Sequence, residues 1–349
     1  MERNEIIAGL PGALLPWYEA NKRDLPWRQD REPYHVWLSE IMLQQTRVEA
    51  VKSYYVRFLE TLPTVEALAN ADDEVLHKLW EGLGYYSRVR NLKKAARVIL
   101  DQYGGVFPRN YAQVLALPGI GPYTAGAICS ICYDQPTPAV DGNVLRVISR
   151  ITDDPAPIDD PAQQKRIRGE LETVYPQPAG NFTQALMELG ATLCGPNWKP
   201  RCQECPCREF CLGHQRGTAE DLPVKAPKKK KRVEEYTVFL LSCEGKLAIE
   251  KRPETGLLAD LWQFPNTPGK LEPEQALEYL AAMGLRPREL LRQAERKHIF
   301  THIRWEMRGY WVEVDEADGG YRWLTREELT REAALPTAFR QFLEEPSGH

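Results

Sequence analysis

Two carboxylates stand in stretches of the chain that could carry out acid–base or charge-stabilising chemistry. Glu40 lies in SEIMLQQT (39–46), within an otherwise apolar helix start, where burial would raise its pKa and suit it to proton donation. Asp141 lies in VDGNVLRV (140–147), directly before a periodic apolar run. Each also has a purely structural interpretation, since Glu40 could face the dipole of a first helical turn and Asp141 could cap the next helix. Asp141 could do both.

A glycine-rich turn lies upstream of Asp141. LPGIGPYTAGA (117–127) predicts two helices joined through Gly119 and Gly121, which is the pattern of a helix-hairpin-helix. Because glycine has no side chain, backbone N–H groups can approach a phosphate at the start of the second helix. A tight turn without a ligand is the alternative, but Leu-Pro-Gly-x-Gly favours binding to the DNA backbone. Gln44 and Gln45 could reach base edges.

Cysteines cluster late in the first two-thirds of the chain. The chain has eight, and four that could act together within eighteen residues are Cys194, Cys202, Cys205 and Cys211, with Cys207 among them. Clustered cysteines in an intracellular chain indicate a metal site and not disulfides. Four thiolates suit a 4Fe–4S cluster or a zinc ion, and the spacing alone does not decide between them. Two short-spaced pairs, the usual pattern of structural zinc, are not seen in this sequence.

Composition sets the broad class. Hydrophobic content of 43% and charged content of 27% are ordinary for a soluble globular protein, and no apolar stretch has the length of a membrane helix or signal peptide. The net charge of −4 does not indicate a nucleic-acid binder. However, residues 82–100 and 225–232 contain five and six basic residues and no acidic one. Such patches can neutralise phosphates, although a solvated helix face and a solvated linker are the alternatives.

The elements that would position these residues follow from periodicity. Residues 1 to about 215 are helical in pattern, most clearly in segments 38–62, 64–84 (two short helices), 91–105 and 111–133 (two helices around a turn). DLPVKAPKKKKRVEE (221–235) predicts a linker, which we expect to lie along DNA. The period then changes to two, which predicts a hairpin at 236–252, strands in 302–314 and a helix at 273–284. We therefore expect an all-α domain (1–220), the linker, and an α+β domain (236–345).

These motifs together resemble the helix-hairpin-helix DNA glycosylases. LPWR (25–28), SEIMLQQTRVEAV (39–51), EGLGYYSRVRNL (81–92) and VDGNVLRV resemble the MutY adenine glycosylases in particular. KRPETGLLADLWQFP (251–265) and YRWLTREEL (321–329) resemble that family's second domain, which is similar to the Nudix hydrolase MutT. The resemblance covers nearly the whole chain. It implies a helix-hairpin-helix subdomain at roughly 30–135, an iron–sulfur subdomain from 1–29 and 136–215, and a Nudix-like domain at 236–345.

The resemblance also implies a reaction. The expected activity is base excision repair, in which adenine opposite 8-oxoguanine, and also opposite guanine, is flipped out and removed hydrolytically with retention. Glu40 would protonate adenine N7, while Asp141 would stabilise the oxocarbenium ion or add to it covalently. Asn143 would orient Asp141, or the acid and its water. Tyr123 stands where strand-cutting relatives carry a Schiff-base lysine, which implies a monofunctional enzyme.

Binding residues are implied by the same likeness. Trp27, Arg28, Leu43 and Gln184 would line the adenine pocket. Gln45, Thr46, Leu83 and Tyr85 would lie at the lesion on the opposite strand, and only one of Tyr85 and Tyr86 would face DNA. Phe300, Thr301 and His302 would lie against the oxidised guanine, although the family has serine at the middle position. Segment 269–285 lacks the acidic arrangement of a Nudix box, so this domain would recognise and not hydrolyse.

The cofactor and cellular context complete the expectation. The four cysteines named above would hold a 4Fe–4S cluster, although GPNWKPR (195–201) makes the first gap seven residues where the family has six. The partner would be double-stranded DNA with adenine opposite 8-oxoguanine, bound by a monomer in the cytoplasm, at the nucleoid in a bacterium, without a membrane. Two alternatives are a strand-cutting glycosylase for oxidised pyrimidines, which Tyr123 disfavours, and a non-catalytic iron–sulfur DNA-binding or redox-sensing protein, which Glu40 and Asp141 disfavour.

Overall fold

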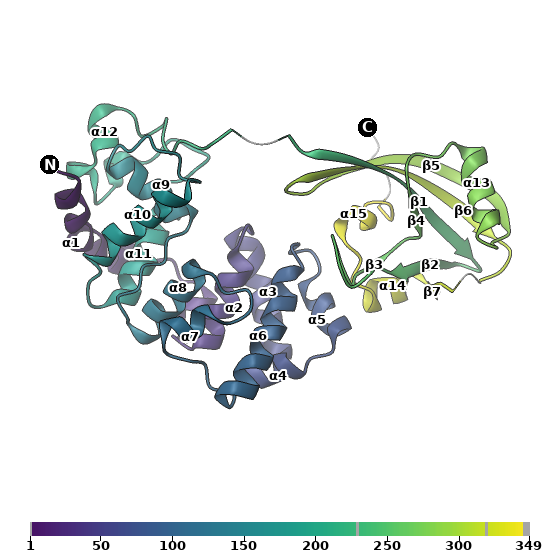
Figure 1. The fold of residues 1–349 in the computed structure, drawn as a ribbon, viewed down its shortest axis with the longest axis horizontal. Helices are drawn as coiled ribbons and strands as arrows, with labels where there is room; N and C mark the ends of the chain where they lie inside the picture. Colours follow the sequence, from purple (N-terminus) through teal and green to yellow (C-terminus); the bar gives the residue numbers. More distant parts are fainter. Residues whose placement is uncertain (1, 228–229, 318–319, 345–349) are drawn as a thin grey trace. The chain divides into compact units, whose positions relative to one another are not determined.

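A computed structural model describes residues 2–227, 230–317 and 320–344. Lys228 and Lys229 of the predicted linker lie outside the described residues, as do 318–319 and 345 of the predicted second domain. The chain divides into two compact units. The first comprises Met1–Ala71 and Arg90–Pro227, and the second comprises Asp72–Val89 and Lys228–His349 (Figure 1).

Within its described residues the first unit contains helices joined by loops and no strand. Its α-helices are α1 (Arg3–Asn21), α2 (Pro33–Leu43), α3 (Val48–Thr61), α4 (Val65–Asn70), α6 (Ser87–Tyr103, from Arg90 on), α7 (Tyr111–Leu115), α8 (Pro122–Tyr133), α9 (Gly142–Ile151), α10 (Pro161–Glu172), α11 (Ala179–Thr192) and α12 (Leu212–Arg216). Short 3-10 turns are η1 (Pro26–Arg28), η2 (Cys202–Glu204) and η3 (Arg208–Phe210). The two helices predicted around the glycine turn are therefore confirmed as α7 and α8.

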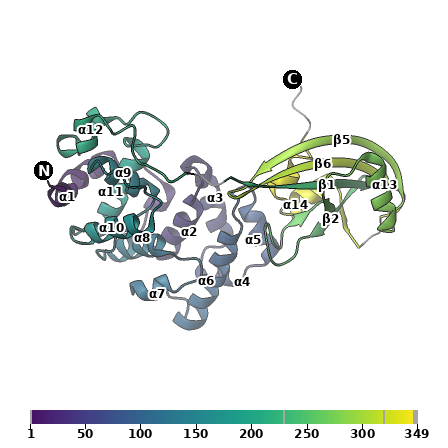
Figure 2. The same cartoon turned by 45° about the horizontal axis from the view of Figure 1, so that its top comes forward.

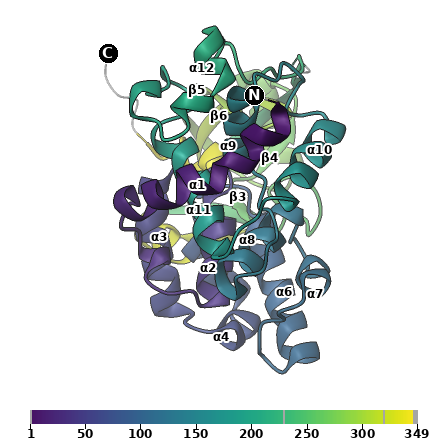
Figure 3. The ribbon, with the colours of Figure 1, turned by 90° about the vertical axis from the view of Figure 1, so that its left-hand side faces the viewer.

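Helices α1, α9, α10 and α11 enclose one hydrophobic core of this unit. Their apolar faces bury Ile6, Leu10, Ile148 and Phe182 almost completely, and α1 lies alongside α11 (Figure 3). Burying a side chain of this size stabilises the fold by about 1.5–3 kcal/mol. Cys207 is fully buried in the same core, so the cysteine segment is packed against these helices.

The alternative in which Glu40 faces the dipole of a first helical turn is wrong. Helix α2 begins at Pro33, because proline fits the first helical position, where a missing N–H costs nothing. Glu40 therefore lies near the C-terminal end of α2 and not in a first turn. At this end the helix dipole disfavours a negative charge, so the dipole gives no reason for a carboxylate here.

The second unit is a mixed sheet with helices on both faces. Its strands are β1 (Arg232–Cys243), β2 (Lys246–Lys251), β3 (Trp262–Gln263), β4 (Asn266–Pro268), β5 (Pro287–Ile299), β6 (Ile303–Val314) and β7 (Arg322–Leu324). Its helices are α5 (Asp73–Trp80), α13 (Pro273–Ala282), α14 (Arg326–Glu332) and α15 (Thr337–Arg340). The main strand order is β3-β2-β1-β6-β5, with β4 on β1 and β7 on β2. Figure 2 shows β2, β1, β6 and β5 in this order.

Alternation along β1 explains the two covered faces. Val238 and Leu240 pack with residues of α14 and α15, whereas Phe239 and Leu241 pack with α13. Successive strand residues point to opposite sides, so a continuous apolar run requires cover on both. The predicted hairpin is confirmed, since Ser242 pairs with Leu247, and the predicted helix appears as α13. β5 was not predicted from the sequence.

Candidate active site

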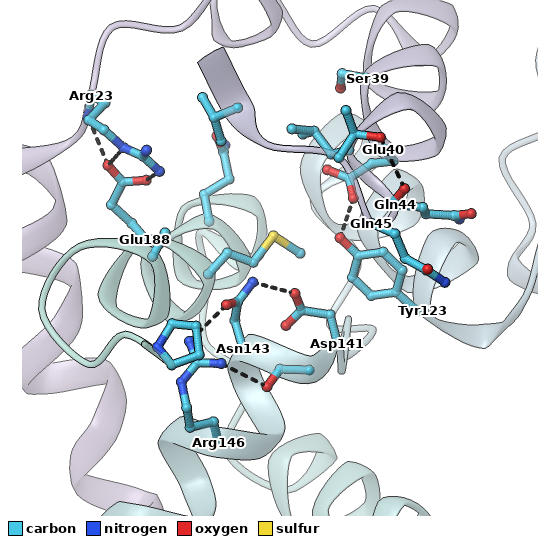
Figure 4. Close-up of a pocket in the computed structure, with 18 of the residues that line it drawn as sticks. Arg23, Ser39, Glu40, Gln44, Gln45, Tyr123, Asp141, Asn143, Arg146 and Glu188 are labelled. Carbon is cyan, nitrogen blue, oxygen red and sulfur yellow. Dashed lines mark hydrogen bonds and ion pairs between the residues drawn. The ribbon is translucent and has the colours of Figure 1, made fainter. Parts of the chain in front are cut away.

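A cavity of about 920 Å³ opens in the first unit where α2, α8, α9 and α11 meet (Figure 4). It brings together eleven residues that the sequence analysis singled out. They are Trp27, Arg28, Glu40, Leu43, Gln44, Gln45, Thr46, Tyr123, Asp141, Asn143 and Gln184. Residues far apart along the chain thus share one site, which is the usual arrangement of a binding or catalytic cavity.

Glu40 is the buried acid of this cavity. Its side chain projects from α2 and accepts a hydrogen bond from the Tyr123 hydroxyl of α8 (Figure 4). Burial, helped by the nearby Asp141, raises the pKa of Glu40 to about 7, although the Tyr123 hydrogen bond partly offsets their effect. Since the carboxyl is 6% exposed, it can hold a proton near neutral pH and still face the cavity.

Asp141 is both a helix cap and a cavity residue. One carboxylate oxygen accepts the Val144 N–H at 2.8 Å, which caps α9, so the capping interpretation is confirmed. The other oxygen accepts the Asn143 side-chain N–H at 2.7 Å. Burial raises the pKa of Asp141, and these hydrogen bonds only partly offset it. The carboxylate is consequently held in one orientation beside the cavity.

Arg146 supports Asn143 from behind and was missed by the sequence analysis. Its guanidinium donates to Asn143 Oδ1 at 2.9 Å and to the backbone carbonyls of Cys194 and Gly190 at 2.8 Å each. Gly190 allows this approach, because a Cβ there would lie 2.7 Å from Asn143 Cβ. The available signal was an arginine in the apolar stretch VLRVISRI, where a charge must find buried partners.

Glu188 was also missed. It is fully buried on α11, where its carboxylate pairs with Arg23 at 2.7 Å and with Arg28 at 2.7 Å. Burial would raise its pKa, but the hydrogen bonds from both arginines outweigh burial and lower it. The result is an ionised carboxylate that fixes Arg28 at the cavity wall. A glutamate inside the apolar run FTQALMEL was the signal in the sequence.

The glycine turn lies apart from this cavity. Gly119 has φ of +75°, and a Cβ there would lie 2.6 Å from Asn91 Cβ, so the position requires glycine. Gly121 is the N-cap of α8, and Pro122 follows it. The backbone amides at this end of α8 therefore form the positive end of a helix, which suits a phosphate.

The remaining predicted residues belong to the second unit. Leu83 is buried, Tyr85 is 46% exposed and Tyr86 is 5% exposed, so Tyr85 is the tyrosine that faces outward. The Tyr85 hydroxyl lies 3.0 Å from Thr301 Oγ1. Phe300 packs edge-on against Trp305, which leaves Thr301 and His302 exposed at the tip before β6.

The cysteines provide a test of the predicted metal ligands. A second, small cavity of the first unit is lined by Cys194, Cys202, Cys205 and Cys211. Among the described residues no three Cys, His, Asp or Glu side chains stand close enough to share one metal ion. Arg150 donates to Cys194 Sγ at 3.3 Å, an interaction that would stabilise a thiolate. The four side chains thus share a space without the tight spacing of a single-ion site.

Comparison with known families agrees with this arrangement. Residues 38–173 match the family described as HhH-GPD superfamily base excision DNA repair protein, and residues 237–345 match the NUDIX domain. The glycine hairpin and the cavity with its buried acid and capping aspartate therefore define a helix-hairpin-helix DNA glycosylase that carries a second, Nudix-like domain.

Relatives identify the family within this class. The chain is 36% identical to the adenine DNA glycosylase of Homo sapiens, over 96% of this chain and 73% of that protein. It is 33% identical to the adenine DNA glycosylase of Buchnera aphidicola subsp. Acyrthosiphon pisum, over 83% of this chain and 82% of that protein. The chain belongs to the adenine DNA glycosylase family, and it is an enzyme of base excision repair.

Solved structures agree on the fold of the helical part. A thermostable thymine-DNA glycosylase aligns with a TM-score of 0.55 and 28% identity, over 61% of this chain and 97% of that one. Endonuclease III in a trapped covalent complex with DNA aligns with a TM-score of 0.53 and 22% identity, over 62% and 99% respectively, and shows the fold alone. In the described part of the chain, no helix has the length and apolarity to span a bilayer.

Proposed function

We propose that this enzyme excises adenine opposite 8-oxoguanine in double-stranded DNA, and opposite guanine as well, by acid-catalysed hydrolysis without strand cutting. The observation that carries the proposal is Glu40, a buried carboxyl with its pKa raised to about 7, in one cavity with Asp141. The test is an excision assay on duplexes with adenine opposite 8-oxoguanine, guanine or thymine. Activity on none of these duplexes would contradict the proposal.

The base end of the cavity would hold a flipped adenine. Trp27, Leu43 and Met187 provide apolar surface for the ring, and Gln184 and Arg28 provide polar groups for its edges. The ion pair with the buried Glu188 holds Arg28 in place, so the N–H groups of Arg28 have a fixed orientation before adenine binds. Glu40 would then donate its proton to adenine N7, which converts a poor leaving group into a neutral one.

The sugar end of the cavity would carry the positive charge of the reaction. As the N-glycosidic bond breaks, charge builds on the sugar, and a carboxylate beneath it stabilises the oxocarbenium-like transition state. Asp141 is held for this role by Val144 N–H and Asn143, and Arg146 fixes Asn143. A carboxylate that shields one sugar face directs water to the same face that adenine left, which gives retention.

Tyr123 determines the absence of strand cutting. A phenol cannot form an imine with the sugar aldehyde, whereas a lysine amine can. We expect borohydride to trap no covalent complex between the wild-type enzyme and its DNA. Tyr123→Lys is expected to yield a trapped complex that is visible as a shifted band in a denaturing gel. Efficient trapping with the wild-type protein would contradict the monofunctional assignment.

Thr301 and His302 are proposed to contact the oxidised guanine. Both are exposed, and Phe300 anchors their loop against Trp305. The hydroxyl and imidazole can hydrogen-bond to the N7–H and O8 that distinguish 8-oxoguanine from guanine. Replacing both by alanine is expected to reduce the preference for 8-oxoguanine over guanine by about tenfold, equivalent to about 1.4 kcal/mol. Single-turnover rates on the two duplexes measure it, and an unchanged ratio would exclude this role.

The four cysteines that line one cavity are proposed to hold a 4Fe–4S cluster. Their common cavity and the Arg150 contact to Cys194 support this proposal. Cys207 is not among the residues that line this cavity. When bound, the cluster supplies metal–thiolate bonds that fix the segment 194–211. It takes no part in the excision step proposed here.

A further inference from the structure

A polar stripe on α5 contacts the C-terminal segments of the second unit. Glu74 and Lys78 are four residues apart, and Glu81 follows after three more, so all three lie on one side of the helix and its extension. Each of them contacts a group between residues 251 and 335. Nothing in the reaction proposed above uses these three side chains.

Glu74 makes the first contact of this stripe. One carboxylate oxygen lies 2.5 Å from Lys251 Nζ, and the other accepts the Trp262 indole N–H at 2.8 Å. Lys251 and Arg322 also lie near the Trp262 ring, at 5.6 and 5.4 Å from its centroid. A carboxylate that satisfies two donors in fixed directions specifies one position, whereas a simple exposed ion pair does not.

Glu81 makes the second contact. Its carboxylate accepts the Leu335 backbone N–H at 3.1 Å and the Lys78 ammonium at 2.6 Å. Lys78 in turn donates to the Ala333 carbonyl at 3.3 Å. Leu335 and Ala333 are buried, so without Glu81 a buried N–H would lose its partner. Because these are backbone groups between α14 and α15, the contact also fixes a position along the chain.

Tyr85 follows the last residue of this stripe, Glu81, after a short turn. Gly82 and Gly84 have positive φ in this turn, which places the Tyr85 hydroxyl in contact with that of Thr301. The loop of Thr301 is held from its other side, where Lys231 donates to the Phe300 carbonyl at 2.7 Å. We infer that Glu74 and Glu81 are positioning residues that hold Tyr85 against Thr301 and thereby set the preference for oxidised guanine.

This inference rests on the proposed role of the Thr301 loop in reading 8-oxoguanine. A hydrogen bond is sensitive to a few tenths of an ångström, so a shift of Tyr85 relative to Thr301 weakens discrimination. Removal of adenine opposite normal guanine does not depend on this discrimination. Loss of the stripe should therefore lower the 8-oxoguanine to guanine rate ratio, and not the basal rate.

Charge reversal tests the inference in the full-length enzyme. Glu74→Lys is expected to lower the rate ratio at least about fivefold, the lower end of typical coupling between sites, with cleavage opposite guanine within about twofold of wild type. The double variant Glu74→Lys, Lys251→Glu should recover most of the ratio, because the pair re-forms with reversed sign. Glu66→Lys, an exposed acid on α4, is the matched control and should change neither rate.

Each outcome decides the question. An unchanged ratio in Glu74→Lys, or a lowered ratio that the second substitution does not recover, would overturn the inference. Thermal unfolding of each variant is measured in parallel, and if Glu74→Lys does not fold, Glu81→Gln must lower the ratio for the inference to stand. A wild-type enzyme with no preference for 8-oxoguanine would overturn the proposed function itself, and the inference with it.

Discussion

Replacing Glu40 by glutamine is expected to lower the single-turnover rate of adenine excision by about 10²- to 10⁴-fold, the usual contribution of a general acid. Glutamine keeps the size of the side chain and can still accept the Tyr123 hydrogen bond, but it has no proton to transfer. Excision is measured on a duplex with adenine opposite 8-oxoguanine, under enzyme excess, so that product release does not limit the rate.

The pH dependence follows from the same residue. In the folded enzyme the pKa of Glu40 is raised from 4.5 to about 7, so the protonated form predominates below about pH 7. Because Glu40 must be protonated to act as the acid, the excision rate should fall about tenfold per pH unit above about pH 7. An unperturbed glutamate would be ionised over this whole range. The Glu40→Gln variant should lack the fall at high pH.

Two measurements separate chemistry from folding in this experiment. Binding of the duplex by Glu40→Gln should stay close to wild type, because the substitution removes only a transferable proton. Glu49→Gln, on an exposed acid of α3, should leave the excision rate and its pH profile unchanged. If Glu40→Gln excised adenine at the wild-type rate, Glu40 would not be the acid.

The sequence predicted which residues form the site more fully than it predicted the hydrogen bonds and ion pairs between them. The apolar neighbourhood of Glu40 and the run after Asp141 were local patterns, and local patterns survive folding. Glu188 and Arg146 escaped notice because their partners, Arg28 and Cys194, lie 160 and 48 residues away along the chain. Only the packing of α9 and α11 shows that these buried charges are paired.

The same limit applies to the elements. β1 and the hairpin to β2 could be predicted because the sequence period changes to two around Glu244-Gly245, and α13 because its apolar residues recur with helical spacing. β5 could not, since RELLRQAERKHI has no fully buried residue, and charged residues stand at both its exposed and its half-buried positions. An edge strand of this kind is specified by its partner β6 and not by its own hydrophobicity.

At Asp141, a substitution can separate the two functions of one side chain, which are capping α9 and placing a negative charge beneath the sugar. Asparagine caps a helix about as well as aspartate, so Asp141→Asn should keep α9 capped and change the unfolding free energy by less than about 0.5 kcal/mol. The variant nevertheless loses the negative charge beneath the sugar. Its excision rate should fall at least about 10²- to 10³-fold, as when one preorganised electrostatic group is removed from a transition state.

The matched control is Asp160→Asn, because Asp160 also caps a helix, α10, by accepting the Ala162 N–H, but does not line the cavity. The change in thermal unfolding of Asp160→Asn should be as small as that of Asp141→Asn, but its excision rate should equal that of the wild type. Asp141→Ala should lose the helix cap as well, which lowers the free energy of unfolding by about 0.5–2 kcal/mol. Its excision rate should not be much lower than that of Asp141→Asn. If Asp141→Asn instead excised adenine at the wild-type rate, the carboxylate would be only a cap, and the charge on the sugar would have to be stabilised by another group of the cavity.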